Sequence, residues 1–153
     1  AAETQLIRKL AARDREVRSH EQAHLAAAGD LALGGASYTY TRGPDGRQYA
    51  TGGEVSIDVA PVPNDPQATL EKAQKIRRAA LAPANPSQQD RAVAARATAM
   101  ATEARVELQR EAQADDSETQ GNKAESSPAE TEHRAPGYSI RLVPHDHHID
   151  TAV

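Results

Sequence analysis

The chain contains no cysteine, phenylalanine or tryptophan and only one methionine. The absence of cysteine excludes disulfide bonds and thiolate metal ligands, although it leaves the cellular compartment open. Hydrophobic residues make up 38% of the 153 residues, and much of that share is alanine, which buries little area. We therefore expect a single domain with a modest core, to whose folding a bound metal can contribute free energy.

Other absences limit the function. No apolar run of about 18 residues occurs, so no membrane-spanning helix is predicted. The formal net charge is −4, whereas a general nucleic-acid-binding protein usually carries a basic face. No signal peptide is visible, and because the chain opens within a predicted helix at Ala1 we expect a fragment of a longer protein. Localisation and oligomeric state stay open.

The clearest chemical signal is a His-Glu-x-x-His motif at residues 20–24. On an α-helix, positions i and i+4 share one face, so His20 and His24 can direct their imidazole nitrogens at one metal ion. Glu21 lies beside that point, where it can take a proton from water. This pattern predicts Zn²⁺ as the cofactor and a peptide or protein as the substrate.

The residues around the motif predict a long helix over residues 1–28. No Gly or Pro occurs from Glu3 to Ala28, and Gly29 is suited to end the helix in a left-handed cap. A spacing of three and four residues places these side chains on one face: Ile7, Leu10, Asp14, Val17, Glu21, His24 and Ala28. The alternative is a solvated helix that carries two surface histidines.

The next part of the chain predicts a β-hairpin. Strands are expected at residues 36–41 and 47–51, because Tyr and Thr are frequent and the pattern alternates. Gly43-Pro44-Asp45-Gly46 is a turn signal between them.

Two further helices and a tail are expected after the hairpin. One helix should run from Pro66 to about Leu81, with Asp65 as its N-cap. The other should run from Gln88 to Gln113, capped by Ser87 or Asn85, with Val93, Ala97, Met100, Ala104 and Leu108 as its apolar stripe. Residues 114–153 are predicted to form a largely disordered acidic tail with a His-rich end. The expected fold class is α+β and mostly helical, with the domain at residues 1–113.

A catalytic zinc ion usually has three protein ligands, so a third must come from elsewhere. Glu54 is the candidate, because it follows Gly52-Gly53, where the backbone can approach another element closely. If residues 54–58 form a helical turn, Asp58 shares its face and can accept a hydrogen bond from His20 or His24. The alternatives are that Glu54 is an exposed acid in a loop and that Asp58 accepts no hydrogen bond from either histidine.

The hairpin tyrosines are secondary candidates. Tyr38, Tyr40 or Tyr49 can donate a hydrogen bond to the oxyanion that forms on a scissile carbonyl. Each is individually better explained as part of the small core. A rival metal cluster lies near the end of the chain and consists of His145, Asp146, His147 and His148. A histidine-rich terminus is more commonly an adventitious chelator than a catalytic site.

Several motifs together resemble the SprA-related family, described as bacterial metallopeptidase catalytic domains. The resemblance covers about residues 10–112, and the matching segments are Asp14–His24, Gly35–Tyr40, Gly43–Gly46, Tyr49–Val55, Asp65-Pro66, Leu81–Pro83 and Ser87–Ala94. It implies a zincin-like fold with zinc held by His20 and His24 and with Glu21 as the base. The Glu54-x-x-x-Asp58 spacing is also similar to that of the gluzincin group, in which the glutamate is the third ligand. The resemblance supplies no substrate.

The sequence therefore predicts a zinc-dependent metallopeptidase. A non-enzymatic alternative is a metal-stabilised interaction module, whose zinc site is structural or closed and whose third helix binds a partner. A third hypothesis is a metal chelator that acts through the His-rich end. The coordination of the metal separates the first two, because an open fourth position that holds water favours the enzyme.

Overall fold

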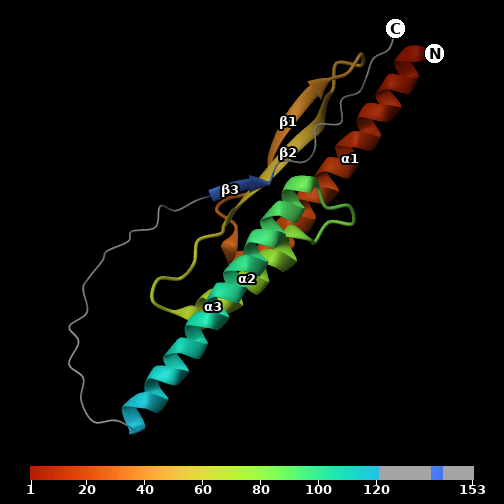
Figure 1. The fold of residues 1–153 in the computed structure, drawn as a ribbon. Coiled ribbons are helices and arrows are strands. Elements are labelled where there is room, and N and C mark those ends of the chain that lie inside the picture. Colours follow the sequence, from red (N-terminus) through yellow and green to blue (C-terminus); the bar gives the residue numbers. More distant parts are fainter. Residues whose placement is uncertain (121–138, 143–153) are drawn as a thin grey trace.

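The computed structural model describes residues 1–120 and 139–142, and it shows a mostly helical α+β fold. Its helices are α1 (Ala2–Ala28), α2 (Pro66–Ala80) and α3 (Gln88–Gln120), with a short 3-10 helix, η1 (Gly29–Leu31), after α1. Its strands are β1 (Ser37–Arg42), β2 (Gln48–Asp58) and β3 (Ser139–Leu142). Figure 1 shows the sheet lying along α1, with α2 and α3 packed side by side. Within the described ranges, no helix is long and apolar enough to cross a membrane.

Helix α1 buries most of the predicted stripe. Its buried residues are Leu10, Val17, Glu21, His24 and Ala28, which confirms the spacing of three and four. The helix ends at Gly29, whose φ of 55° lies in the left-handed region that glycine adopts without strain. A charged residue and a histidine are thus held on the core-facing side of α1.

The hairpin is confirmed, but its second strand is longer than predicted. β1 pairs antiparallel with β2 around the turn at Gly43–Gly46, where Gly46 has a φ of 77°. β2 continues through Glu54 to Asp58, so the condition under which Asp58 would share a helical face with Glu54 is not met. Along this strand Gly53, Val55 and Ile57 are buried, in the alternation that a sheet with one covered face shows.

Gly53 is the point of closest approach between the sheet and α1. A Cβ atom at this position would lie 2.8 Å from Cγ of Glu21 and 3.1 Å from Cδ1 of Tyr38. Only glycine therefore lets β2 lie directly against Glu21. Farther along α1, Asp14 accepts a hydrogen bond from the backbone N–H of Ala50 at 2.7 Å, which fixes the same strand at a second point.

Helices α2 and α3 complete the core. α2 begins as predicted, with Pro66 in its first turn and Asp65 accepting from the N–H of Ala68. The main cluster joins all three helices to β2 and consists of Ala28, Val55, Ile57, Ile76, Ala79, Ala80, Val93, Ala94 and Ala97. Because most of these side chains are small, the helices and the strand approach one another closely.

Two findings change the predicted tail. α3 continues to Gln120, because no Gly or Pro follows Pro86 until Gly121, so the acidic composition does not end the helix at Gln113. β3 adds a third, antiparallel strand beside residues 55–58 of β2, which gives the sheet order β1-β2-β3. Within the range predicted to be largely disordered, the structure thus describes helix at residues 115–120 and a strand at residues 139–142. The other residues of the predicted tail, with its His-rich end, lie outside the described residues.

Candidate metal centre

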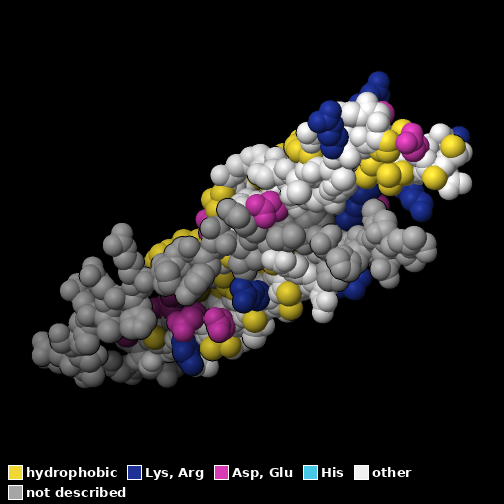
Figure 2. Space-filling model, turned by 90° about the horizontal axis from the view of Figure 1, so that it is seen from above, with side chains coloured by type: hydrophobic (Ala, Val, Ile, Leu, Met, Phe, Trp, Pro, Cys, Tyr) yellow, Lys and Arg dark blue, Asp and Glu magenta, His cyan; other side chains and the backbone are white. Residues whose placement is uncertain are grey.

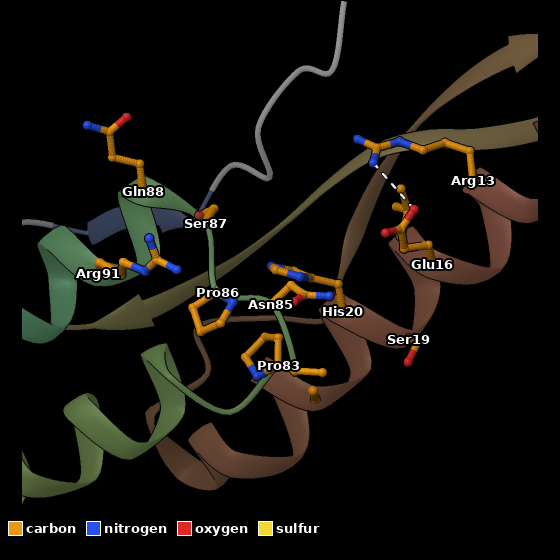
Figure 3. A pocket seen from close by; sticks show the side chains of 13 residues that line it. Arg13, Glu16, Ser19, His20, Pro83, Asn85, Pro86, Ser87, Gln88 and Arg91 are labelled. Atoms are coloured by element: carbon orange, nitrogen blue, oxygen red, sulfur yellow. Dashed lines mark ion pairs between the residues drawn. The ribbon is translucent and has the colours of Figure 1, made fainter. Parts of the chain in front are cut away.

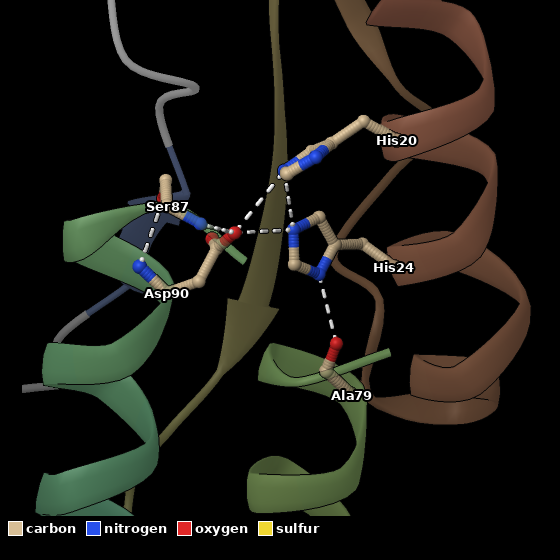
Figure 4. Close-up of polar contacts among 5 residues, drawn as sticks. All are labelled: His20, His24, Ala79, Ser87 and Asp90. Atoms are coloured by element: carbon tan, nitrogen blue, oxygen red, sulfur yellow. Dashed lines mark hydrogen bonds and ion pairs between the residues drawn. The ribbon is translucent and has the colours of Figure 1, made fainter. Parts of the chain in front are cut away.

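His20 and His24 lie one turn apart on α1 and direct their imidazoles at the same point (Figure 4). Their Nε2 atoms are 3.1 Å apart. The His24 side chain is completely buried, whereas the His20 side chain is 15% exposed. The spacing of the motif therefore predicted the convergence of the two rings correctly.

Asp90 from α3 completes the cluster. Its Oδ2 atom lies 3.1 Å from Nε2 of His20 and 3.2 Å from Nε2 of His24, and its side chain is 1% exposed. A reciprocal capping arrangement holds it: the Ser87 N–H donates to Oδ2 at 2.8 Å, and the Asp90 N–H donates to the Ser87 hydroxyl at 3.0 Å. The first turn of α3 therefore fixes the carboxylate opposite the two histidines.

The spacing of these three atoms fits a metal ion. Zinc bonds of about 2.0–2.1 Å in tetrahedral geometry place neighbouring ligand atoms about 3.3 Å apart. The three separations here are 3.1, 3.1 and 3.2 Å. Two imidazole nitrogens and one carboxylate oxygen form a donor set that zinc accepts.

The hydrogen bond at Nδ1 of His24 orients the imidazole ring so that Nε2 can bind a metal ion. Nδ1 lies 2.8 Å from the Ala79 carbonyl oxygen, and a carbonyl can only accept, so Nδ1 carries the proton. In the neutral ring, Nε2 then presents its lone pair to His20 and Asp90. Metal-ligating histidines are typically oriented by such a bond to a backbone carbonyl.

The electrostatics of the cluster favour a positive charge between these groups. Burial raises the pKa of the Asp90 carboxyl, but hydrogen bonds with His20, His24 and the Ser87 N–H lower it by a larger amount. The pKa of Asp90 therefore lies well below its ordinary value. Burial lowers the pKa of His24, whereas Asp90 and the Ala79 carbonyl raise it by more. A proton or a divalent cation can supply the charge.

Glu21 lies next to this cluster and is 0% exposed. Among the described residues neither of its carboxylate oxygens has a hydrogen-bond partner, and Oδ1 of Asp90 has none either. Burial raises the pKa of Glu21 to about 7, against the opposing effect of His20 and His24, while Asp90 and Glu54 raise it further. A buried carboxylate without partners costs stability, and such groups occur mainly at functional sites.

The structure does not bring Glu54 or Asp58 into the cluster. Both residues lie on β2, on the face opposite Gly53, Val55 and Ile57. Asp58 instead accepts hydrogen bonds from Lys72 at 2.8 Å and from the Ala60 N–H at 3.0 Å. At His24 the Ala79 carbonyl takes the role that the sequence analysis assigned to Asp58. The group that could hold a metal within the described chain is His20, His24 and Asp90.

The tyrosines occupy other positions. Tyr49 donates a hydrogen bond to Asp45 in the hairpin turn, and Tyr40 is 48% exposed. The ring of Tyr38 borders Gly53, and one of its faces is covered by Arg18, whose guanidinium carbon is 5.1 Å from the ring centroid. The oxyanion role of the tyrosines stays a prediction.

A cavity of about 580 Å³ opens beside His20 (Figure 3). Its walls are α1 between Arg13 and Ala23, the α2–α3 connection from Pro83 to Ser87, and the first turn of α3 with Gln88 and Arg91. A volume of this order is typical of ligand pockets. His20 therefore borders both the buried cluster and a space that is open to a ligand.

Comparison with protein families gives a match to the SprA-related family over residues 1–126. The chain belongs to the SprA-related family. The match extends from α1 through α3, so this SprA-related domain includes all the residues of the cluster and the cavity. Comparisons with curated proteins and with solved structures give no match.

Proposed function

We propose that this SprA-related domain is a zinc-dependent metallopeptidase with a zincin-like site. In this proposal His20, His24 and Asp90 hold the zinc ion, and Glu21 is the general base. The observation that carries it is the juxtaposition of three converging donor atoms, a buried carboxylate without a hydrogen-bond partner in the described chain, and an adjoining cavity. A zinc ion bound here supplies Lewis acidity, which polarises a peptide carbonyl and lowers the pKa of water.

In this proposal, residues of the chain transfer the proton and orient the metal ligands. Glu21 accepts a proton from the attacking water on a carboxylate oxygen and passes it to the leaving amine nitrogen. Glu21 is buried against Gly53, and neither of its carboxylate oxygens has a hydrogen-bond partner among the described residues. Ala79 holds the His24 tautomer and Ser87 holds the Asp90 carboxylate, so the donors are oriented before a ligand enters.

The cavity beside His20 favours the enzyme over the metal-stabilised interaction module. A structural zinc site is closed by four protein ligands, whereas a catalytic site keeps one position open to a cavity. The described cluster offers three donor groups, and His20 borders the cavity. The hypothesis of a chelator at the His-rich end concerns residues 145–148, which lie outside the described residues.

Removal and return of the metal test the proposal. The full chain, loaded with zinc and incubated with a defined peptide library, should yield new termini that mass spectrometry detects. A chelator should abolish cleavage, and stoichiometric zinc should restore it, because the reaction depends on the bound ion. Cleavage that survives complete removal of the metal would contradict the proposal. A zinc-loaded protein that cleaves no peptide would favour the interaction module.

A further inference from the structure

The cavity beside His20 carries an uneven distribution of charge. Its charged lining residues are Arg13, Glu16 and Arg91. Arg13 lies 3.8 Å from a carboxylate oxygen of Glu16 and also donates to the Thr51 carbonyl at 3.4 Å, so these two side chains balance each other. Arg91 is exposed and forms no ion pair within the described part of the chain. The cavity therefore has an excess of one positive charge, which Arg91 supplies.

The fold places this guanidinium at the cavity that His20 also borders. Arg91 immediately follows Asp90, whose position the capping arrangement with Ser87 fixes. Figure 3 shows the Arg91 side chain extending from α3 toward Pro86 and the cavity, on the opposite wall from Glu16. Arg91 and His20 both line the cavity, so a group bound by Arg91 lies in the same space that the histidine borders.

The described side chains visible in Figure 2 do not gather charge of one sign. On the face shown in Figure 2, basic and acidic side chains are interspersed rather than gathered by sign. The net charge of the chain is −4, so the overall charge does not attract anions. An anionic ligand would thus be selected locally at the cavity.

We propose that this cavity binds a carboxylate of the peptide substrate and that Arg91 is its specificity-determining residue. A guanidinium presents a planar fork of N–H donors that matches a carboxylate with two parallel hydrogen bonds. The carboxylate comes either from an acidic side chain near the scissile bond or from a free C-terminus, since both present the same group. The inference rests on the proposed peptidase function, because it names the substrate class of that site.

The test uses matched peptides that differ at single positions. One series carries Glu, Gln or Lys at each position that flanks the cleaved bond, and a second compares a free with an amidated C-terminus. Cleavage is followed with zinc-loaded wild type, and binding is followed by fluorescence anisotropy with zinc-loaded Glu21→Gln. We expect the Glu peptide, or the free C-terminus, to be preferred about tenfold over its neutral partner, as a charge-assisted hydrogen bond at a partly exposed site provides.

Variants of Arg91 test whether this residue causes the preference for a carboxylate. Arg91→Glu should remove the preference for the carboxylate and favour the Lys peptide, while its zinc content stays equal to that of wild type. Arg91→Lys should keep part of the preference, because the charge remains and the fork is lost. Arg96→Glu is the matched control, since Arg96 is exposed on the same helix and does not line this cavity, and it should retain the wild-type preference.

The outcomes separate this inference from the proposed function. Cleavage without preference between charged and neutral peptides overturns the inference alone. A carboxylate preference in binding, without cleavage by wild type, supports the cavity's specificity and contradicts the peptidase. A preference that Arg91→Glu leaves unchanged, or the absence of any peptide binding, overturns the inference.

Discussion

Glu21→Gln should slow peptide cleavage by orders of magnitude while leaving the zinc site intact. The amide has the size of the carboxylate but cannot accept a proton, and loss of a general base typically lowers the rate by about 10²–10⁴-fold. Glu21 lies outside the cluster of His20, His24 and Asp90, so zinc affinity should stay near that of wild type. Single-turnover cleavage of one defined peptide measures the first effect, and competition with a chromogenic chelator measures the second.

The stability of this variant is an independent check. Because the carboxylate of Glu21 is buried and none of the described residues donates a hydrogen bond to it, its charge opposes folding. Metal-free Glu21→Gln should therefore melt at or above the temperature of metal-free wild type. Cleavage that persists in the variant would remove Glu21 as the base. Loss of zinc would show that Glu21 is itself a ligand.

Asp90→Asn should lose zinc affinity without losing the fold. An amide oxygen can still accept from the Ser87 N–H, so the start of α3 keeps its cap, but a neutral amide is a poor zinc ligand. We expect a loss larger than the roughly 10–100-fold that removal of a ligand's hydrogen-bonding partner costs. Chelator competition measures the affinity, and the increase in melting temperature on adding zinc reports the same loss. Zinc at 100 times its Kd stabilises a folded protein by about 2.7 kcal/mol.

Glu54→Gln is the matched control for this experiment. The sequence predicted Glu54 as the third ligand, whereas the structure groups Asp90 with the histidines. The control should therefore bind zinc nearly as tightly as wild type. Full affinity in Asp90→Asn together with a loss in Glu54→Gln would reverse our assignment and restore the prediction made from the sequence.

Local patterns predicted the elements of this fold well, because their causes lie within a few residues. The stripe from Leu10 to Ala28 follows from helical spacing, and the turn at Gly43–Gly46 follows from residues suited to it. The convergence of His20 and His24 was predictable for the same reason, since one helix carries both residues. In each case the sequence spacing fixes the geometry directly.

The third member of the cluster depends on tertiary packing and was missed. Asp90 is 70 residues from His20, and only the packing of α3 brings it to α1. Glu54 was favoured because it follows two glycines, but in a strand the alternation of faces turns it away from the side that Gly53 shows to Glu21. One local signal was present: Ser87-x-x-Asp90 is a capping box with an acid, which predicts an aspartate fixed at the start of a helix.

A crystal structure of the zinc-loaded chain, with anomalous data collected across the zinc edge, tests the central claim most directly. We expect one zinc ion within about 2.0–2.2 Å of Nε2 of His20, Nε2 of His24 and an Oδ atom of Asp90, with a non-protein ligand on the cavity side. Glu21 should face that ligand without touching the metal. A zinc ion bound by Glu54 in place of Asp90, a fourth protein side chain that closes the site, or no zinc at these residues would contradict it.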